Sequence, residues 1–203
     1  NIAYFSADDG ATGTELWKTD GTAVGTTLIL DIYSGTSSSS PNTFKQSGAL
    51  VFFYASDISG NSVWVTNGTA VSTRKVGGIE IATQASNPAY MTHLNGLTYF
   101  RADDGVHGYE LWVNDGTPQG SRMIKDVNPG SGQGAENIYA VGGRIFFRGN
   151  DGVRGWELWT TDGTESGTTM VKNINPNGDT GIEYLTFAAG QWFFRANDVN
   201  CCD

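Results

Sequence analysis

Residues 157–164 read ELWTTDGT, and variants of these eight residues recur along the chain. Residues 15–22 read ELWKTDGT, residues 110–117 read ELWVNDGT, and residues 62–69 hold the more divergent SVWVTNGT. The tryptophans of these four segments are separated by 47, 48 and 47 residues. A constant period of this size is typical of propeller blades or solenoid units. The sequence therefore predicts four tandem copies of one structural unit.

Pairs of aromatic residues recur with the same period and mark the repeat boundaries. The pairs are Tyr4-Phe5, Phe52-Phe53, Tyr99-Phe100, Phe146-Phe147 and Phe193-Phe194. They divide the chain into four full repeats at 1–50, 51–97, 98–144 and 145–191, and a partial fifth repeat at 192–203. We expect residues 1–203 to form a single domain in which the partial repeat supplies a first strand without the rest of its unit.

Each repeat carries four strand-like segments and nothing that reads as a long helix. The first segment holds the aromatic pair, and the second holds the tryptophan and ends in Asp-Gly or Asn-Gly, which are strong hairpin signals. The third segments are expected at 27–32, 122–127 and 169–174, and the fourth around Phe44, Met91, Tyr139 and Leu185. The predicted fold is all-β, a β-propeller of four-stranded antiparallel blades plus one extra strand. A solenoid of such sheets is the competing architecture.

The eight-residue signature resembles the bacterial protein family that is named after its ELWxxDGT repeat. The resemblance covers essentially the whole chain, and Gly-Thr pairs at 25–26 and 167–168 extend the match. The second repeat departs from it, with Ser62 and Asn67 in place of Glu and Asp. The resemblance implies a secreted or surface-exposed protein of propeller type, without an established general activity. The polar loops are also similar to the Asp-box hairpins of other propellers, whose role is structural.

The composition argues against two classes of partner. Twenty-one acidic and 12 basic side chains give a formal charge of −9, which repels a nucleic-acid backbone. No apolar run approaches the roughly 20 residues that a membrane-spanning helix needs. We therefore expect no nucleic-acid partner and no membrane span, and the family resemblance places the protein outside the cell or on its surface.

A polar loop with two glycines follows the first strand in three of the repeats. It reads DDGATG at 8–13, DDGVHG at 103–108 and NDGVRG at 150–155. We favour turn carboxylates that accept backbone N–H groups. The alternative is a calcium site, because Ca²⁺ prefers carboxylate and carbonyl oxygens; no other cofactor is expected. Its candidate ligands are Asp8, Asp9, Asp103, Asp104, Asn150 and Asp151.

One glutamate and one arginine also recur at constant positions. The glutamates, each two residues before a tryptophan, are Glu15, Glu110 and Glu157. The arginines, each directly after an aromatic pair, are Arg101, Arg148 and Arg195. A buried carboxylate needs a partner, so we expect the two sets to form ion pairs. The alternative is that the arginines line a central channel and hold an anion.

The residues expected to bind a ligand lie where the polar loops vary on a constant scaffold. Tyr109 and Trp156 occupy the last position of the third and fourth loops, and His107 and Arg154 stand two residues earlier. An aromatic ring beside cationic and carboxylate groups suits stacking on, and hydrogen bonding to, a sugar. These four residues are candidates for a carbohydrate site. Alternatively, the rings pack over the edge of the blade.

Two further sets of residues are candidates for contacts at the surface. Asn67 begins the sequon Asn-Gly-Thr on a hairpin turn and is a candidate glycosylation site in a secreted setting. Trp192, Cys201 and Cys202 belong to the partial repeat and are candidates for contact between chains. Adjacent cysteines rarely close a disulfide with each other, so these two thiols either link chains or have no structural role.

Catalytic patterns are missing from the sequence. His93 and His107 lack zinc-ligand spacing, and neither a nucleophile elbow nor a phosphate-binding glycine loop is present. The sequence predicts a non-catalytic extracellular module for adhesion, protein contacts or self-assembly, with other copies of itself or surface proteins as partners. A carbohydrate-binding lectin is the alternative, and a glycan-active enzyme is the weaker one.

Overall fold

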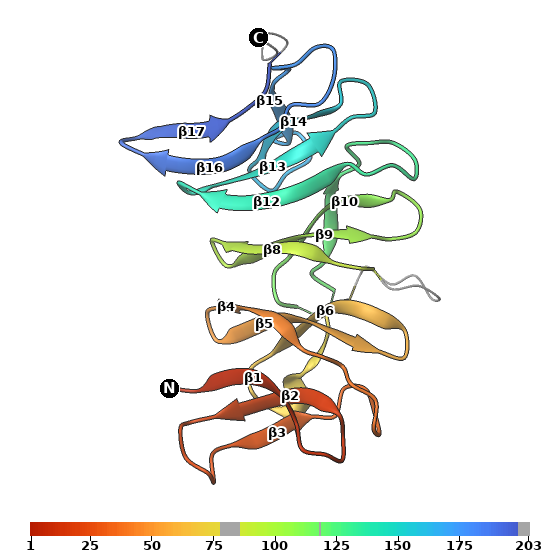
Figure 1. Ribbon diagram of the computed structural model, residues 1–203, viewed down its shortest axis with the longest axis vertical. Helices are drawn as coiled ribbons and strands as arrows, with labels where there is room; N and C mark the ends of the chain where they lie inside the picture. The colour runs from red at the N-terminus through yellow and green to blue at the C-terminus, as the bar shows by residue number, and fades with distance from the viewer. Residues whose placement is uncertain (78–85, 118, 199–203) are drawn as a thin grey trace. The chain divides into compact units, whose positions relative to one another are not determined.

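The computed structural model describes residues 1–77, 86–117 and 119–198, and it is built from antiparallel β-sheets (Figure 1). The first sheet contains β1 (Ala3–Asp8), β2 (Thr14–Thr19) and β3 (Thr27–Leu30). The second contains β4 (Asn42–Ser47), β5 (Leu50–Asp57), β6 (Gly60–Thr66) and β7 (Arg74–Lys75), with the 3₁₀ turn η1 (Ala70–Ser72) before β7. The predicted all-β class is confirmed.

Two more four-stranded sheets and one two-stranded sheet follow. The third contains β8 (Ala89–Leu94), β9 (Leu97–Asp103), β10 (Tyr109–Asn114) and β11 (Arg122–Lys125). The fourth contains β12 (Ala135–Val141), β13 (Arg144–Asn150), β14 (Trp156–Thr161) and β15 (Thr169–Lys172). The fifth contains β16 (Glu183–Ala188) and β17 (Gln191–Arg195). In the parts of the chain that the structure describes, no helix has the length and apolarity needed to cross a membrane.

The sheets are offset by one strand from the sequence repeats. The last strand of one repeat pairs with the first strand of the next, as β8 does with β9. Two-residue turns join these strands, and at Asn95-Gly96 and Gly142-Gly143 both residues have positive φ, as hairpins of this length require. In the same way β17, the first strand of the partial repeat, pairs with β16, the last strand of the fourth repeat.

The first strand of each offset sheet carries a β-bulge. The pairing register shifts between Asn42 and Lys45, and at the matching places in β8, β12 and β16. One residue in each bulge has positive φ, and these residues are Thr43, Tyr90, Asn137 and Tyr184. An extra residue at this point bends the strand and breaks its regular ladder of hydrogen bonds.

The chain folds into two compact units, and each has its own apolar packing. One unit comprises residues 1–88 and 114–121, and the other comprises 89–113 and 122–203. In the first unit, Leu16 and Ile29 of one sheet pack with Phe53 and Trp64 of the next. In the second unit, the third and fourth sheets bury a larger cluster between them. That cluster includes Leu111, Val113, Ile124, Ile145, Phe147 and Trp159.

The fourth and fifth sheets also pack face to face. Phe146 and Leu158 of the fourth sheet are buried with Ile182, and Leu185 and Trp192 pack against them. The rings of Phe146 and Trp192 have centroids 4.3 Å apart. Tyr99 and Phe146, the first aromatic residues of their pairs, pack against the following sheet, whereas Phe53 and Phe147, the second residues, pack against the preceding one.

Candidate functional site

The loop carboxylates hold their own turns. Asp9 Oδ1 accepts the backbone N–H groups of Ala11 and Thr12, at 2.8 Å each. Asp104 and Asp151 accept the corresponding pairs of N–H groups in their own loops, at distances between 2.7 and 3.0 Å. These hydrogen bonds confirm the structural interpretation of the polar loops.

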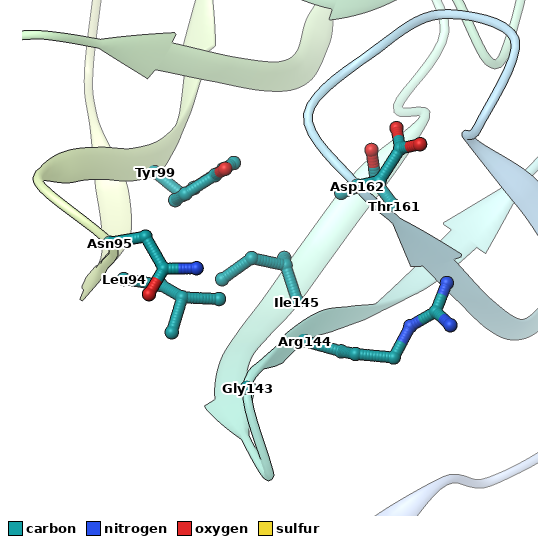
Figure 2. Close-up of a pocket in the computed structure, with 8 residues that line it drawn as sticks. All are labelled: Leu94, Asn95, Tyr99, Gly143, Arg144, Ile145, Thr161 and Asp162. Atoms are coloured by element: carbon teal, nitrogen blue, oxygen red, sulfur yellow. The ribbon is translucent and has the colours of Figure 1, made fainter.

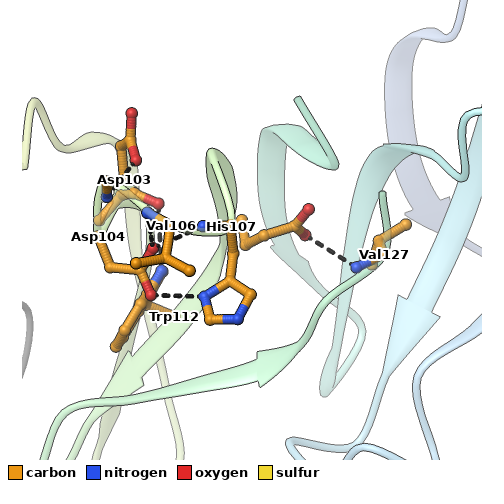
Figure 3. Close-up of polar contacts among 9 residues, drawn as sticks. Asp103, Asp104, Val106, His107, Trp112 and Val127 are labelled. Atoms are coloured by element: carbon orange, nitrogen blue, oxygen red, sulfur yellow. Dashed lines mark hydrogen bonds and ion pairs between the residues drawn. The ribbon is translucent and has the colours of Figure 1, made fainter. Parts of the chain in front are cut away.

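The predicted ligand residues His107 and Arg154 also bind these carboxylates. His107 Nδ1 lies 2.7 Å from Asp104 Oδ2, as Figure 3 shows, and Arg154 Nη1 lies 2.5 Å from Asp151 Oδ2. Burial opposes the charge of Asp104, but the N–H group and ring of His107 together outweigh it and hold the pKa of Asp104 below its usual range. The hydrogen bond that the ring of His107 donates to Asp104 in turn raises the pKa of His107. Both cationic side chains are therefore engaged within their own loops.

The loops carry few additional oxygen atoms for a cation. Asp103 Oδ1 accepts the N–H of Gly105, and Asn150 Oδ1 accepts that of Gly152. Asp8 Oδ1 accepts the N–H of Gly10 in the same way. Among the described residues, no group of three or more His, Cys, Asp or Glu side chains is arranged to hold a metal ion. The calcium site stays a prediction.

The recurring glutamates are buried and bind backbone N–H groups, so the predicted pairing with the recurring arginines is wrong. Glu110 is fully buried and accepts N–H groups from Val127 and Asn128, at 3.1 Å each. Glu157 accepts the matching groups of Ile174 and Asn175, at 3.2 Å each. Each carboxylate thus ties its strand to the segment that leaves the last strand of the same sheet.

The recurring arginines lie on the opposite face of the sheet from the recurring glutamates. Arg148 forms an ion pair with Glu136, and Arg195 pairs with Glu183 at 2.8 Å. Both glutamates lie on the neighbouring strand, directly across from the arginine in the β-sheet register. Arg101 has no such partner and instead lies against the rings of two tyrosines.

The predicted aromatic ligand residues stack on these arginines. The guanidinium carbon of Arg101 lies 4.5 Å from the ring centre of Tyr109, and that of Arg148 lies 5.3 Å from that of Trp156. Tyr109 and Trp156 are half-buried, so each presents part of its ring to solvent. The structure thus places each aromatic residue beside an arginine from the preceding strand. The sequence carried this signal as a constant arginine eight residues before each aromatic position.

A pocket of about 360 Å³ lies at the other ends of these strands, in the second unit. Figure 2 shows Tyr99 and Leu94 facing Ile145, with Arg144 and Asp162 on the far side. Burial raises the pKa of Tyr99, and the hydroxyl and N–H of Thr164 lower the pKa of Asp162. The pocket contains none of the predicted ligand residues. Its lining combines strand residues with Asn95, Gly143 and Asp162 from the adjoining turns.

The remaining candidate residues have separate positions. Asn67 is exposed, and its side-chain oxygen accepts hydrogen bonds from Thr69 and Ser72, which leaves the glycosylation site a prediction. Trp192 packs within its own chain, against Phe146 and Phe187. Cys201 and Cys202 lie outside the described residues.

In comparisons with known proteins, no family model matches the chain, and no curated protein matches it in sequence.

Proposed function

We propose that this chain is a non-catalytic extracellular repeat module of β-propeller type, related to ELWxxDGT-repeat proteins, and that copies of it associate head to tail. The observation that carries the proposal is the exposure of one aromatic side chain. Phe193 of β17 is 49% exposed, whereas its counterpart Phe146 in the preceding sheet is 6% exposed.

The contacts of Phe146 indicate the kind of surface that would cover Phe193. Phe146 points toward the following sheet and is covered there by Trp192. Phe193 occupies the same place in the fifth sheet, so a further sheet of the same kind fits against it. Burying a phenylalanine side chain in such a contact contributes about 1.5–3 kcal/mol.

The first sheet presents the complementary surface. Phe53 and Phe147 point to the preceding sheet and are fully buried, whereas Phe5, their counterpart in β1, is half-buried. Trp17 lies across from Phe5 in the same sheet and is also half-buried. The first sheet of a second copy therefore offers the surface that would cover Phe193. An interface between two different surfaces continues from copy to copy unless it closes into a ring.

The repeated carboxylates support a scaffold role over catalysis. The buried glutamates and the loop aspartates bind backbone N–H groups of their own sheets. Removing these carboxylates would destabilise the sheets. The variable loop residues are then the ones that can contact partners.

Sedimentation velocity over a range of protein concentrations tests the proposal. We expect wild-type protein to form oligomers that grow with concentration, and Phe193→Ser and Phe5→Ser each to abolish them. An equimolar mixture of the two variants should form dimers, because each variant retains one intact surface. Val71→Ser is the matched control, since Val71 is 99% exposed and lies far from both surfaces in the sequence.

Two results would overturn the assembly. One is a wild-type chain that stays monomeric at every concentration, as expected if the first and fifth sheets closed a ring within one chain. The other is a mixture of the two serine variants that remains monomeric while the wild type associates, which would indicate a symmetric interface.

A lectin is the second candidate, and the stacking of Tyr109 and Trp156 on arginines favours it. Each pair combines an apolar ring with a fork of N–H donors, which suits a sugar with polar substituents. A glycan array, read with and without Ca²⁺, tests this function. Failure to bind any glycan under both conditions would exclude it.

A further inference from the structure

The three recurring arginines differ in one respect, which is the residue across from each in the sheet. Glu136 lies across from Arg148, and Glu183 lies across from Arg195. The residue across from Arg101 is Ala89. The chain therefore supplies a carboxylate to two of these arginines and a methyl group to the third.

Among the residues that the structure describes, Arg101 contacts aromatic rings and has no counter-ion. Its guanidinium carbon lies 5.0 Å from the ring centre of Tyr90 and 4.5 Å from that of Tyr109. Its Nε is buried without a hydrogen-bond partner. Within 1–77, 86–117 and 119–198, no carboxylate forms an ion pair with it. The planar guanidinium thus lies between two aromatic rings, and none of the hydrogen bonds or ion pairs found among the described residues involves it.

A fixed guanidinium fork matches the geometry of a carboxylate, which it binds through two parallel hydrogen bonds. The pair between Arg148 and Glu136 shows that the same position in the next sheet takes such a group. We propose that Arg101, Tyr90 and Tyr109 bind the carboxylate of an acidic sugar residue.

The surroundings of Arg101 favour a sugar over an acidic peptide. The ring of Tyr90 is 40% exposed beside the guanidinium and offers a flat apolar face with a hydroxyl at its edge. A formal charge of −9 on the chain disfavours a partner with many negative charges, whereas a single carboxylate meets one cation. This site does not depend on head-to-tail assembly. It rests on the lectin function proposed above and restricts the expected ligands to glycans that contain uronic acid residues.

Titration calorimetry with three probes tests the ligand class. The probes are an oligosaccharide ending in glucuronic acid, its methyl ester, and a short glutamate peptide. We expect the free acid to bind with one site per chain, and the ester and the peptide to bind at least about tenfold more weakly, because the ester lacks the charge that strengthens these hydrogen bonds and the peptide lacks the sugar ring. Equal binding of acid and ester, or preference for the peptide, would overturn the proposal.

Four variants test the residues. Arg101→Gln should lose binding of the acid, and Arg101→Lys should weaken it about tenfold, because a lysine lacks the fork. Arg195→Gln is the matched control and should bind normally, since that arginine is exposed and paired with Glu183. Ala89→Glu should supply the chain's own carboxylate and block the site. Unchanged binding in Arg101→Gln or Ala89→Glu, with the fold intact by circular dichroism, would contradict the assignment.

The reciprocal change provides a gain of function. Glu136→Ala removes the carboxylate from Arg148, which keeps its ring partner Trp156. We expect the number of bound acids per chain to rise from one to two. A glycan array negative for all glycans would remove the lectin function itself, whereas binding of neutral glycans alone would remove only the carboxylate site.

Discussion

Glu15 and Glu110 occupy the same place in two repeats, and both are fully buried, but their surroundings differ. Glu15 accepts hydrogen bonds from the N–H groups of Ile32, Tyr33 and Ser39, and from the hydroxyl of Ser39 at 2.6 Å. Among the residues that the structure describes, Glu110 accepts hydrogen bonds from two N–H groups, those of Val127 and Asn128. Gly134 also lies against Glu110, but its N–H donates to the backbone oxygen of Tyr109 and not to the carboxylate. The glutamates at this one position of the repeat thus accept different numbers of hydrogen bonds.

The shortage of donors has an electrostatic consequence for Glu110. Burial raises its pKa to about 8, against the lowering effect of its two N–H partners, and the charge of Asp126 adds to the rise. A carboxylic acid that stays protonated near neutral pH carries no charge, so it needs fewer hydrogen-bond donors around it than a carboxylate does. The repeat therefore tolerates fewer donors around Glu110 than around Glu15.

The largest expected effect is on the free energy of unfolding after truncation of Glu15. Glu15→Ala leaves four donors without their acceptor, and we expect a loss of about 3–5 kcal/mol. Glu110→Ala exposes two unpaired N–H groups and should cost about 1–3 kcal/mol. Urea denaturation of both variants measures the difference. A cost for Glu110→Ala equal to or above that of Glu15→Ala would contradict the comparison.

The next effect is a pH dependence that belongs to Glu110. Its folded pKa is raised, so the folded state holds a proton that the unfolded state releases above its ordinary pKa. Stability from this group is present at low pH and is lost as the pH rises toward 8, with a slope of at most about 1.4 kcal/mol per pH unit.

Glu110→Gln should remove this slope, as measured by urea denaturation between pH 5 and 8. His107 contributes in the same direction, because its pKa is also raised, so the relevant quantity is the difference between wild type and variant. Parallel stability curves for the two proteins would show that Glu110 does not titrate in this range.

A smaller effect is expected from Gly134, which is tightly packed against Glu110. A Cβ at this position would lie about 2.0 Å from Glu110 Oε1, so Gly134→Ala forces the side chain to move. We expect a cost of about 1–3 kcal/mol. The cost should shrink in the Glu110→Ala background, where the collision is absent. Additive effects of the two changes in thermal unfolding would place the strain elsewhere.

The smallest effect concerns the hydroxyl of Ser39. Ser39→Ala removes one hydrogen bond to Glu15 and keeps the backbone N–H that also binds it. We expect a loss of about 1 kcal/mol, comparable to an ordinary buried hydrogen bond. The control is Ser59→Ala, which removes a hydroxyl bound to the more exposed Asp57. A larger loss from the control would reverse the expected order.

The periodic residues predicted the strands but not how those strands are grouped. The tryptophans and aromatic pairs place the first and second strands, and β4, β8, β12 and β16 contain the predicted Phe44, Met91, Tyr139 and Leu185. The grouping was missed because sheets follow hydrogen bonds and not repeat boundaries. Asn95-Gly96 and Gly142-Gly143 were the available signals, since such dipeptides make two-residue hairpins.

The candidate site was predicted less completely than the fold. The loop positions of Tyr109 and Trp156 were identified, but their arginine partners were assigned to the wrong carboxylates. Glu110 accepts a hydrogen bond from a backbone N–H group 17 residues further along the chain. Composition and spacing do not reveal such a pairing. Pairing of Arg148 with Glu136 depends on a bulged strand register, which no local pattern specifies.

The bulges of β4, β8, β12 and β16 also bear on how these sheets resist aggregation. Each of these strands lies at the edge of its sheet, where a regular row of unpaired backbone groups would recruit a strand from another chain. A residue with positive φ near the start of the strand, such as Tyr90 or Tyr184, turns that row out of line. An incoming strand finds no continuous template there, so these bulged edges are protected against amyloid-like growth.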